Sequence, residues 1–170
     1  MIEIRPESQT DIFAINKVNI AAFGRENEAR LVDLLRDNES LVLSMVAETN
    51  GSIVGHIAYS PIMINYSDGS QMSALALAPV AVLPEFQKLG IGIRLVQVSL
   101  DILKARGTSV VIVLGHPEYY PRFGFVPASR YNIKCPFEVP DDTFMLLELT
   151  GGILENKEGV VKYRPEFDQV

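Results

Sequence analysis

Two glycines, Gly90 and Gly92, follow a long apolar segment that ends at Val82, and they open an amphipathic segment over residues 90–106. If the first segment is a strand and the second a helix, several backbone N–H groups at the helix start converge on one point and can bind an anion. Glycine lets the backbone approach a phosphate without a Cβ in the way, and the helix dipole adds partial positive charge. The spacing therefore predicts an anion site, although a glycine-containing turn before an ordinary helix has the same pattern.

Two other phosphate-binding motifs can be tested on the same string. A Walker loop needs Gly-x4-Gly-Lys-Ser/Thr, which does not occur in the chain. A dinucleotide fingerprint needs a third glycine three residues after Gly92, where Leu95 stands. It also needs an acidic residue at the end of the next strand, and Leu114-Gly115-His116 offers no carboxylate there. A nucleotide-dependent oxidoreductase is therefore a minor alternative.

A second group of reactive side chains lies in the string Tyr119-Tyr120-Pro121-Arg122-Phe123-Gly124-Phe125, shortly after the apolar run 110–114. That run is short and fully apolar, so we expect a buried parallel strand that is reached through the preceding helix. His116 then stands at the carboxyl end of this strand, and a histidine pKa near neutrality suits proton transfer. A histidine that merely structures the loop beside Pro117 is the alternative.

Both strings match motifs of one enzyme family, in the expected order. The string from Ala78 to Gly92 resembles motif A of the GNAT acetyltransferases, whose signature is Gln/Arg-x-x-Gly-x-Gly/Ala. The string from Tyr119 to Phe125 is similar to their motif B, in which a Tyr stands four residues before Gly-Phe. Other features that resemble the YhbS-like branch of predicted N-acetyltransferases are two opening helices, His116-Pro117 and Gly55-His56-Ile57. The resemblance covers roughly residues 1–150.

The resemblance implies an α/β chain with the GNAT fold. This is a mixed, mostly antiparallel twisted sheet with a central splayed parallel strand pair and helices on both faces. The activity that it implies is an N-acetyltransferase that uses acetyl-CoA (coenzyme A) as co-substrate, without a metal. Such an enzyme transfers an acetyl or short acyl group to the primary amine of a small molecule or peptide by direct attack. We expect a single GNAT domain over residues 1–170.

The resemblance also implies how the coenzyme is held. The splayed strands would leave a slot for the pantetheine arm, with the Val80 N–H aimed at the thioester carbonyl. Pro79 cannot donate a ladder hydrogen bond, which independently fits a break in strand pairing at this point. The residues expected to bind acetyl-CoA are Val80, Ala81, Val82, Gln87, Lys88, Leu89, Gly90, Ile91, Gly92 and Ile93.

Tyr120 matches the position from which the family's tyrosine protonates the coenzyme A thiolate, so we expect it to be the general acid. Packing of its ring against Phe123 and Phe125 is a compatible alternative. No residue is clearly the general base, because Ala76 stands where many relatives carry a glutamate. Either water or His116 would then accept the proton of the amine.

Two further residues have competing interpretations. Glu28 would border the acceptor groove in the family layout and could pair with an ammonium, or it is a solvated charge on a helix. His56 alternates with apolar neighbours on a strand, so we expect it to be structural. The missing base also motivates the main alternative function, a non-catalytic acyl-CoA-binding sensor or interaction module.

Hydrophobic periodicity and turn residues predict the order of the elements. Helices are expected over residues 12–23, 26–36 and 90–106. Strands are expected over 2–5, 41–48, 53–66, 71–82, 110–114, 143–149 and 160–163, with a hairpin turn at Asn50-Gly51 and a long loop over 129–142.

The composition narrows the classes of partner. The chain has 170 residues, 48% of them hydrophobic, which suits one compact domain. No apolar run reaches the roughly 18 residues needed to cross a bilayer, and the start is unlike a signal peptide, so we expect a cytoplasmic protein with no membrane partner. A single cysteine excludes an internal disulfide, and a net charge of −6 without a basic cluster disfavours nucleic acid. By analogy with the resembling proteins, a homodimer is expected.

Overall fold

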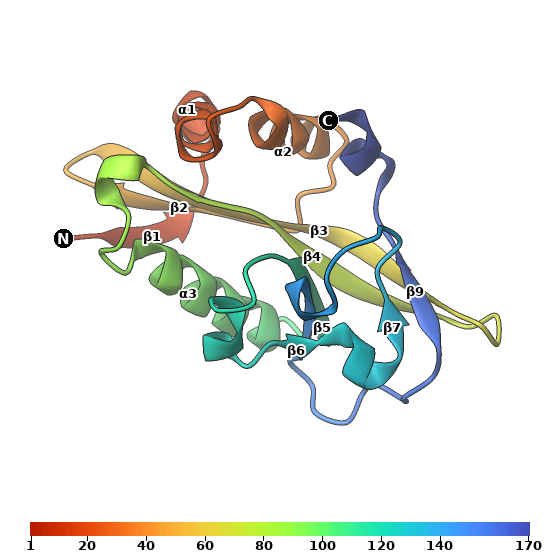
Figure 1. Ribbon diagram of the computed structural model, residues 1–170. Coiled ribbons are helices and arrows are strands. Elements are labelled where there is room, and N and C mark those ends of the chain that lie inside the picture. The colour runs from red at the N-terminus through yellow and green to blue at the C-terminus, as the bar shows by residue number, and fades with distance from the viewer. The chain divides into compact units, whose positions relative to one another are not determined.

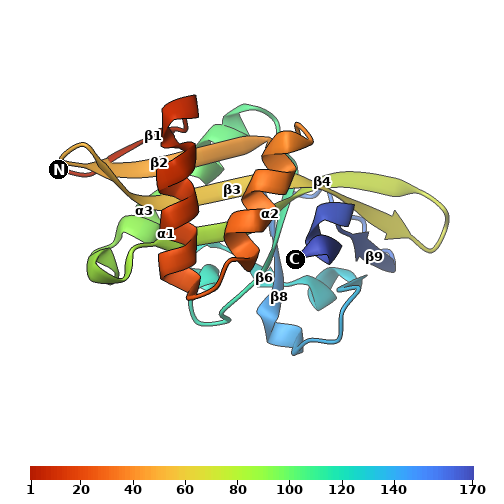
Figure 2. The same cartoon turned by 90° about the horizontal axis from the view of Figure 1, so that it is seen from above.

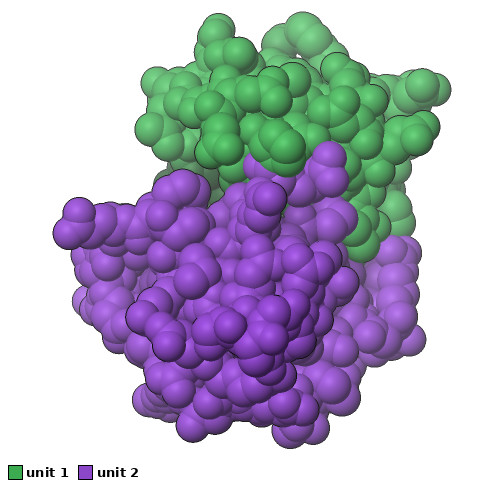
Figure 3. Space-filling view, turned by 90° about the vertical axis from the view of Figure 1, so that its right-hand side faces the viewer, with its two compact units in different colours: residues 1–60, 78–101, 165–170 green, residues 61–77, 102–164 purple.

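The computed structural model describes every residue from Met1 to Val170. The chain forms two compact units (Figure 3). Unit 1 comprises residues 1–60, 78–101 and 165–170, and unit 2 comprises residues 61–77 and 102–164. The two longest strands contribute residues to both units. The single domain expected over residues 1–170 stays a prediction.

Three antiparallel strands form the sheet of unit 1. They are β1 (Glu3–Pro6), β2 (Leu43–Thr49) and the first part of β3 (Ser52–Tyr66). Asn50 and Gly51 connect β2 to β3 with φ angles of 49° and 74°. Two positive φ angles are what a type I′ turn requires, so the hairpin predicted from the Asn-Gly pair is confirmed.

Helices cover both faces of the unit 1 sheet (Figure 1). α1 (Ile12–Phe23) and α2 (Asn27–Asp37) lie over one face. They run side by side when the sheet is viewed from above (Figure 2). The part of α3 (Ile91–Ala105) that belongs to unit 1 lies beneath the other face. No helix of the chain is both long and apolar enough to span a bilayer.

Packing on the two faces follows from the alternation of side chains along the strands. On the face under α1 and α2, Ile15, Val32 and Val46 form a buried apolar cluster. On the opposite face, the Tyr59 hydroxyl and Ser99 Oγ lie 2.7 Å apart and join β3 to α3. Both faces of this sheet therefore contact helices through buried side chains.

The sheet of unit 2 is mixed. Its neighbouring strands are β4 (Gln71–Val82), β5 (Val110–Leu114), β8 (Phe144–Glu148) and β6 (Val126–Pro127), in that order. β9 (Gly159–Lys162) pairs with the end of β3 and with β7 (Ile133–Lys134). Only β4–β5 and β7–β9 are parallel. β6 and β7 fall within stretches where no strand was expected, because two residues are too short to show an alternation.

The parallel pair of β4 and β5 is very short. The ladder joins Leu75 to Val111 and Ala76 to Ile112, yet both strands continue beyond it. From Val110 onward, β5 is instead fully paired with β8 on its other side. A central parallel pair whose pairing stops early is the splayed arrangement expected for the GNAT fold, and this fold is confirmed.

Short 3-10 helices fill several connections. They are Gln9–Asp11, Pro84–Phe86, Tyr120–Phe123, Ala128–Tyr131, Asp141–Thr143 and Pro165–Gln169.

Candidate functional site

The glycine loop of unit 1 leads from β4 into α3. The first helical hydrogen bond of α3 runs from the Arg94 N–H to the Gly90 carbonyl at 3.0 Å. The N–H groups of Ile91, Gly92 and Ile93 therefore have no partner within the helix. Gly90 has a φ of +84°, and no atom lies within 4 Å of the place where a Cβ would stand. Open space beside unpaired N–H donors at a helix start fits a phosphate group.

Three residues before Gly90 form the exposed rim of the loop. Lys88 and Leu89 are exposed, as expected of a rim. The Gln87 side chain is exposed, and one of its two amide N–H groups donates to the Val82 carbonyl at 3.0 Å, which leaves the second free. This bond ties the loop back to the end of β4. Gln87 therefore shapes the loop, which sequence spacing alone did not indicate.

The last residues of β4 alternate in burial. Pro79 and Ala81 are buried, whereas Val80 and Val82 are half-buried. The Ala78–Pro79 peptide bond is cis. The expected pantetheine-binding residues Val80 and Val82 thus share one face of β4, and Ala81 points to the opposite face.

Glu28 in the first turn of α2 has a partner. Its Oε1 and Oε2 accept from Arg25 Nε at 3.0 and 3.1 Å, and Arg25 Nη2 also contacts Oε1. Only 14% of the Glu28 side chain is exposed, against 62% of Arg25. An acceptor ammonium would have to compete with this guanidinium. The i,i+3 spacing of Arg25 and Glu28 is the sequence feature from which this ion pair could have been predicted.

Tyr120 in unit 2 begins the 3-10 helix after β5 and is 6% exposed. Edge-on aromatic contacts hold its ring, with centroid distances of 5.1 Å to Tyr119 and 5.6 Å to Phe125. Burial raises the pKa of the Tyr120 hydroxyl well above its ordinary value, and Tyr119 adds to the effect. The phenol therefore keeps its proton at neutral pH. The packing expected as the alternative interpretation of Tyr120 is therefore present, and its role as general acid stays a prediction.

His116 is exposed and lines a hollow of about 500 Å³ in unit 2, together with Pro117, Glu118, Tyr119 and Arg122. The Arg122 guanidinium lies over the Tyr119 ring at 4.7 Å, and its Nε donates to the Tyr119 carbonyl at 2.9 Å. The His116 carbonyl accepts from the Tyr119 N–H at 3.1 Å. We expected, as the alternative to proton transfer, that His116 structures the loop. Its backbone carbonyl does so through this hydrogen bond, whereas its imidazole is exposed to solvent.

Ala76, at the position where many relatives carry a glutamate, has no side-chain group that could accept a proton. It is 1% exposed and paired with Ile112 on β5. No cluster of three or more His, Cys, Asp or Glu side chains could hold a metal ion.

His56 is fully buried within unit 1 and takes part in a chain of polar contacts. Ser44 Oγ donates to a Glu7 carboxylate oxygen at 2.5 Å and lies 2.8 Å from His56 Nε2. Because the Ser44 hydroxyl proton is used on the carboxylate, Nε2–H must donate to Ser44, and Nδ1 then accepts from Asn19 Nδ2 at 3.1 Å. Burial lowers the pKa of His56 to about 4. His56 is thus the structural residue that the sequence predicts.

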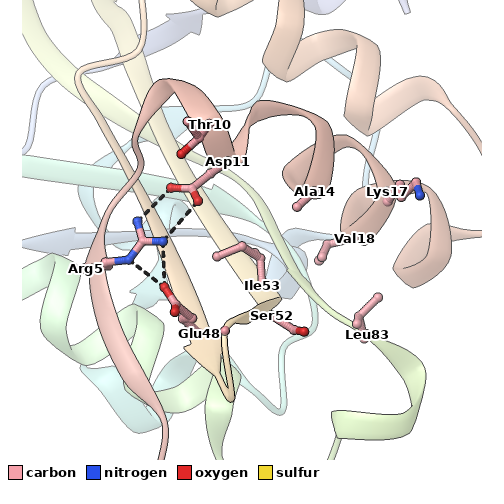
Figure 4. Close-up of a pocket in the computed structure, with 11 residues that line it drawn as sticks. Arg5, Thr10, Asp11, Ala14, Lys17, Val18, Glu48, Ser52, Ile53 and Leu83 are labelled. Carbon is pink, nitrogen blue, oxygen red and sulfur yellow. Dashed lines mark hydrogen bonds and ion pairs between the residues drawn. The ribbon is translucent and has the colours of Figure 1, made fainter.

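A second hollow lies in unit 1 and contains none of the predicted site residues (Figure 4). Its volume is about 580 Å³, and its wall includes β1, α1, Ser52, Ile53 and Leu83. Arg5 spans its polar side, with ion pairs of 2.7 Å to Asp11 and 2.7 Å to Glu48. Arg5, Asp11 and Glu48 are scattered in the sequence, so no motif marked them. The two carboxylates satisfy the guanidinium, and this contact fastens β1 to β2 and to the start of α1.

The chain is similar to a known family of proteins in both sequence and fold. Residues 3–128 match the family model of the acetyltransferase (GNAT) domain. The uncharacterised N-acetyltransferase YhbS of Escherichia coli K12 is 30% identical over 98% of both chains. Its structure in complex with CoA superposes with a TM-score of 0.91 and covers 98% of this chain and 92% of that chain. A GNAT family acetyltransferase from Brucella melitensis in complex with acetyl-CoA is 34% identical, with a TM-score of 0.81 and 99% coverage of both chains.

Proposed function

Because the chain belongs to the GNAT acetyltransferase family, we propose that it transfers an acetyl or short acyl group from acetyl-CoA to a primary amine. The observation that carries this proposal is the open, left-handed Gly90 in front of the unpaired N–H groups of α3. The similar proteins from E. coli and B. melitensis are described as complexes with CoA and acetyl-CoA. Bound acetyl-CoA supplies the acyl group as an activated thioester.

In this proposal, the N–H groups from Gly90 to Ile93 bind the pyrophosphate, and Lys88 adds a positive charge at the rim. Gln87 positions the loop through Val82. The backbone of Val80 and Val82 holds the pantetheine arm, and the Val80 N–H donates to the oxyanion that forms during attack. Removing one such donor typically costs about 3 kcal/mol in the barrier.

Proton transfer is assigned to two groups with different surroundings. The amine nitrogen attacks the thioester carbon, and the C–S bond breaks as the Tyr120 hydroxyl gives its proton to the departing sulfur. The amine proton leaves to water or to the solvent-exposed His116 imidazole. Glu28 is retained as a candidate acceptor contact, on condition that the acceptor displaces Arg25.

One observation favours a second candidate, an acyl-CoA-binding sensor without turnover. Ala76 is a buried, uncharged residue at the position where many relatives carry the base. The small-molecule or peptide amine as acceptor, the homodimer and the cytoplasmic location remain predictions from sequence.

Measurement of free-thiol release from acetyl-CoA tests both candidates. The acceptor panel should contain polyamines, amino acids, aminoglycosides and peptide N-termini. We expect release with at least one class of amine, and a kcat about 100-fold lower in Tyr120→Phe, which is within the usual range for loss of a general acid. Equal kcat values in the two proteins would remove Tyr120 from the mechanism. Release with no amine, combined with tight acetyl-CoA binding, would favour the sensor.

A further inference from the structure

We propose that Gly115 is a positioning residue for Tyr120, because the missing side chain at Gly115 leaves the space in which the edge of the Tyr120 ring lies. The inference rests on the proposed role of Tyr120 as general acid. It assigns a function to a residue just after β5 that carries no reactive group of its own.

The contact is close on the side of the ring that leads to the hydroxyl. A Cβ at Gly115 would stand 2.4 Å from Tyr120 Cε2, 3.1 Å from Cδ2 and 3.4 Å from Cζ. A distance of 2.4 Å is far inside van der Waals contact, so one of the two groups would have to move. Cε2 is bonded to Cζ, which carries the hydroxyl, and any displacement of this edge therefore moves the acidic oxygen.

Space, and not backbone conformation, requires glycine at this position. Gly115 is not among the glycines with a left-handed φ, unlike Gly124 in the same connection, whose φ is +98°. An alanine at residue 115 is therefore compatible with the backbone. The effect of the substitution would come from the added methyl group.

The backbone at Gly115 cannot easily recede. Its N–H donates to the Thr143 carbonyl at 2.9 Å, directly after the pairing of Leu114 with Phe144. On its other sides, the Tyr120 ring is confined by the aromatic rings of Tyr119, Phe123 and Phe125, at centroid distances of 5.1, 6.3 and 5.6 Å. A methyl at Gly115 must therefore push the phenol out of its present place.

A kinetic cycle tests the proposal with the acceptor identified in the thiol-release panel. Gly115→Ala should lower kcat about 10- to 100-fold, since a misplacement of about 1 Å can cost 100-fold. The KM for acetyl-CoA should stay near that of the wild type. In the Tyr120→Phe background the same substitution should change kcat very little, because the hydroxyl that it displaces is already gone.

Two other glycines of unit 2 provide matched controls. No atom lies within 4 Å of the place where a Cβ at Gly151 would stand, so Gly151→Ala adds a methyl in open space. Gly159 is crowded by a different tyrosine, since a Cβ there would lie 2.9 Å from Tyr66 Cδ1. Gly159→Ala should lower stability, and its effect on kcat should be the same with and without the Tyr120 hydroxyl.

Thermal unfolding tests the contact without turnover. Gly115→Ala should lower the Tm of the wild type and should lower it much less in Tyr120→Ala, which has no ring to displace. If Gly115→Ala lowers the Tm equally in the wild type and in Tyr120→Ala, the inference is overturned, whatever the kinetics show. Equal kcat losses in the wild-type and Tyr120→Phe backgrounds also overturn it. A wild-type protein that releases no thiol with any amine contradicts the proposed function, and the positioning role then fails with it, even if the unfolding cycle supports the contact.

Discussion

At the scale of single residues, the surroundings of the titratable groups determine what each can do. Tyr120 is buried among aromatic rings, which holds its proton in place, whereas the side chain of His116 is exposed to solvent. His56 has a third kind of environment, in which every ring nitrogen has a protein partner and no solvent is in contact. Histidine is therefore exposed to solvent at residue 116 and part of the buried structure at residue 56.

The buried His56 predicts how stability depends on pH. Its pKa is lowered from 6.5 to about 4 in the folded protein, mainly by burial. The unfolded chain therefore binds the proton first, and the contribution to stability is present above pH 6.5 and is lost as pH falls toward 4. Between pH 6.5 and 4.5 the free energy of unfolding should fall by about 2 kcal/mol.

Urea unfolding across this pH range checks the prediction, with His56→Gln as the comparison. The variant should be less stable at pH 7 and should lose less stability on acidification. Burial acts to raise the pKa of the nearby Glu7, but Arg36 and Ser44 bind its carboxylate and leave that pKa below its ordinary value of 4.5. Its contribution is lost only below that value, so the interval above pH 4.5 belongs to His56. Parallel curves for the two proteins would contradict the assignment.

At the scale of elements, the connection from β4 to α3 is the part of unit 1 that we propose to bind the coenzyme. Both ends of α3 are flanked by a left-handed glycine, Gly90 with a φ of +84° and Gly107 with a φ of +85°. Neither has a neighbour within 4 Å of a Cβ position. Their backbones and surroundings are therefore closely matched, and only Gly90 lies in the proposed phosphate loop.

This match predicts different outcomes for two alanine variants. Gly90→Ala and Gly107→Ala should each lower the free energy of unfolding by about 1 kcal/mol, because alanine is strained at a left-handed φ. Only Gly90→Ala should also weaken acetyl-CoA binding, since its methyl would enter the space beside the α3 N–H groups. Denaturant unfolding and a calorimetric titration with acetyl-CoA measure the two effects. Equal affinities in the two variants would move the phosphate site elsewhere.

Much of the fold could be predicted because its elements carry a local signal. The long helices, the strands near 43–66 and 71–82, and the parallel strand 110–114 all have a period or an apolar run that reveals them. β6 and β7 could not be found, because two residues have no period. The residues of the glycine loop could be identified from spacing, whereas the contact of Gln87 with Val82 depends on how the loop closes.

Other features of the structure depend on contacts that no local pattern encodes. The crowding of Gly115 by Tyr120 is a matter of available space after the chain has turned back on itself. The ion pairs of Arg5 with Asp11 and Glu48 join residues that are up to 43 positions apart. Such pairs need the register of β1 against β2, which aligns Glu3 with Glu48.

At the scale of the whole molecule, the charge and the family point to different partners. A net charge of −6 attracts a cationic amine and repels a polyanion such as coenzyme A at long range. Coenzyme binding must therefore come from short-range donors, such as those we propose at the helix start beside Gly90. The net charge thus favours the acceptor at long range, whereas the coenzyme depends on local hydrogen bonds.

Binding of the coenzyme also predicts a change in the stability of the folded chain. Acetyl-CoA at about 100 times its Kd should add about 2.7 kcal/mol to the free energy of unfolding. For a chain of 170 residues, this corresponds to a rise in Tm of about 5 to 10 °C.

NADH also carries adenine and a pyrophosphate but lacks the pantetheine thioester, so it should leave the Tm nearly unchanged at the same concentration. If NADH alone raised the Tm, the loop would bind a dinucleotide despite Leu95 standing in place of the third glycine. If acetyl-CoA raised it in the wild type and in Gly107→Ala but less in Gly90→Ala, the stabilisation would originate at the start of α3.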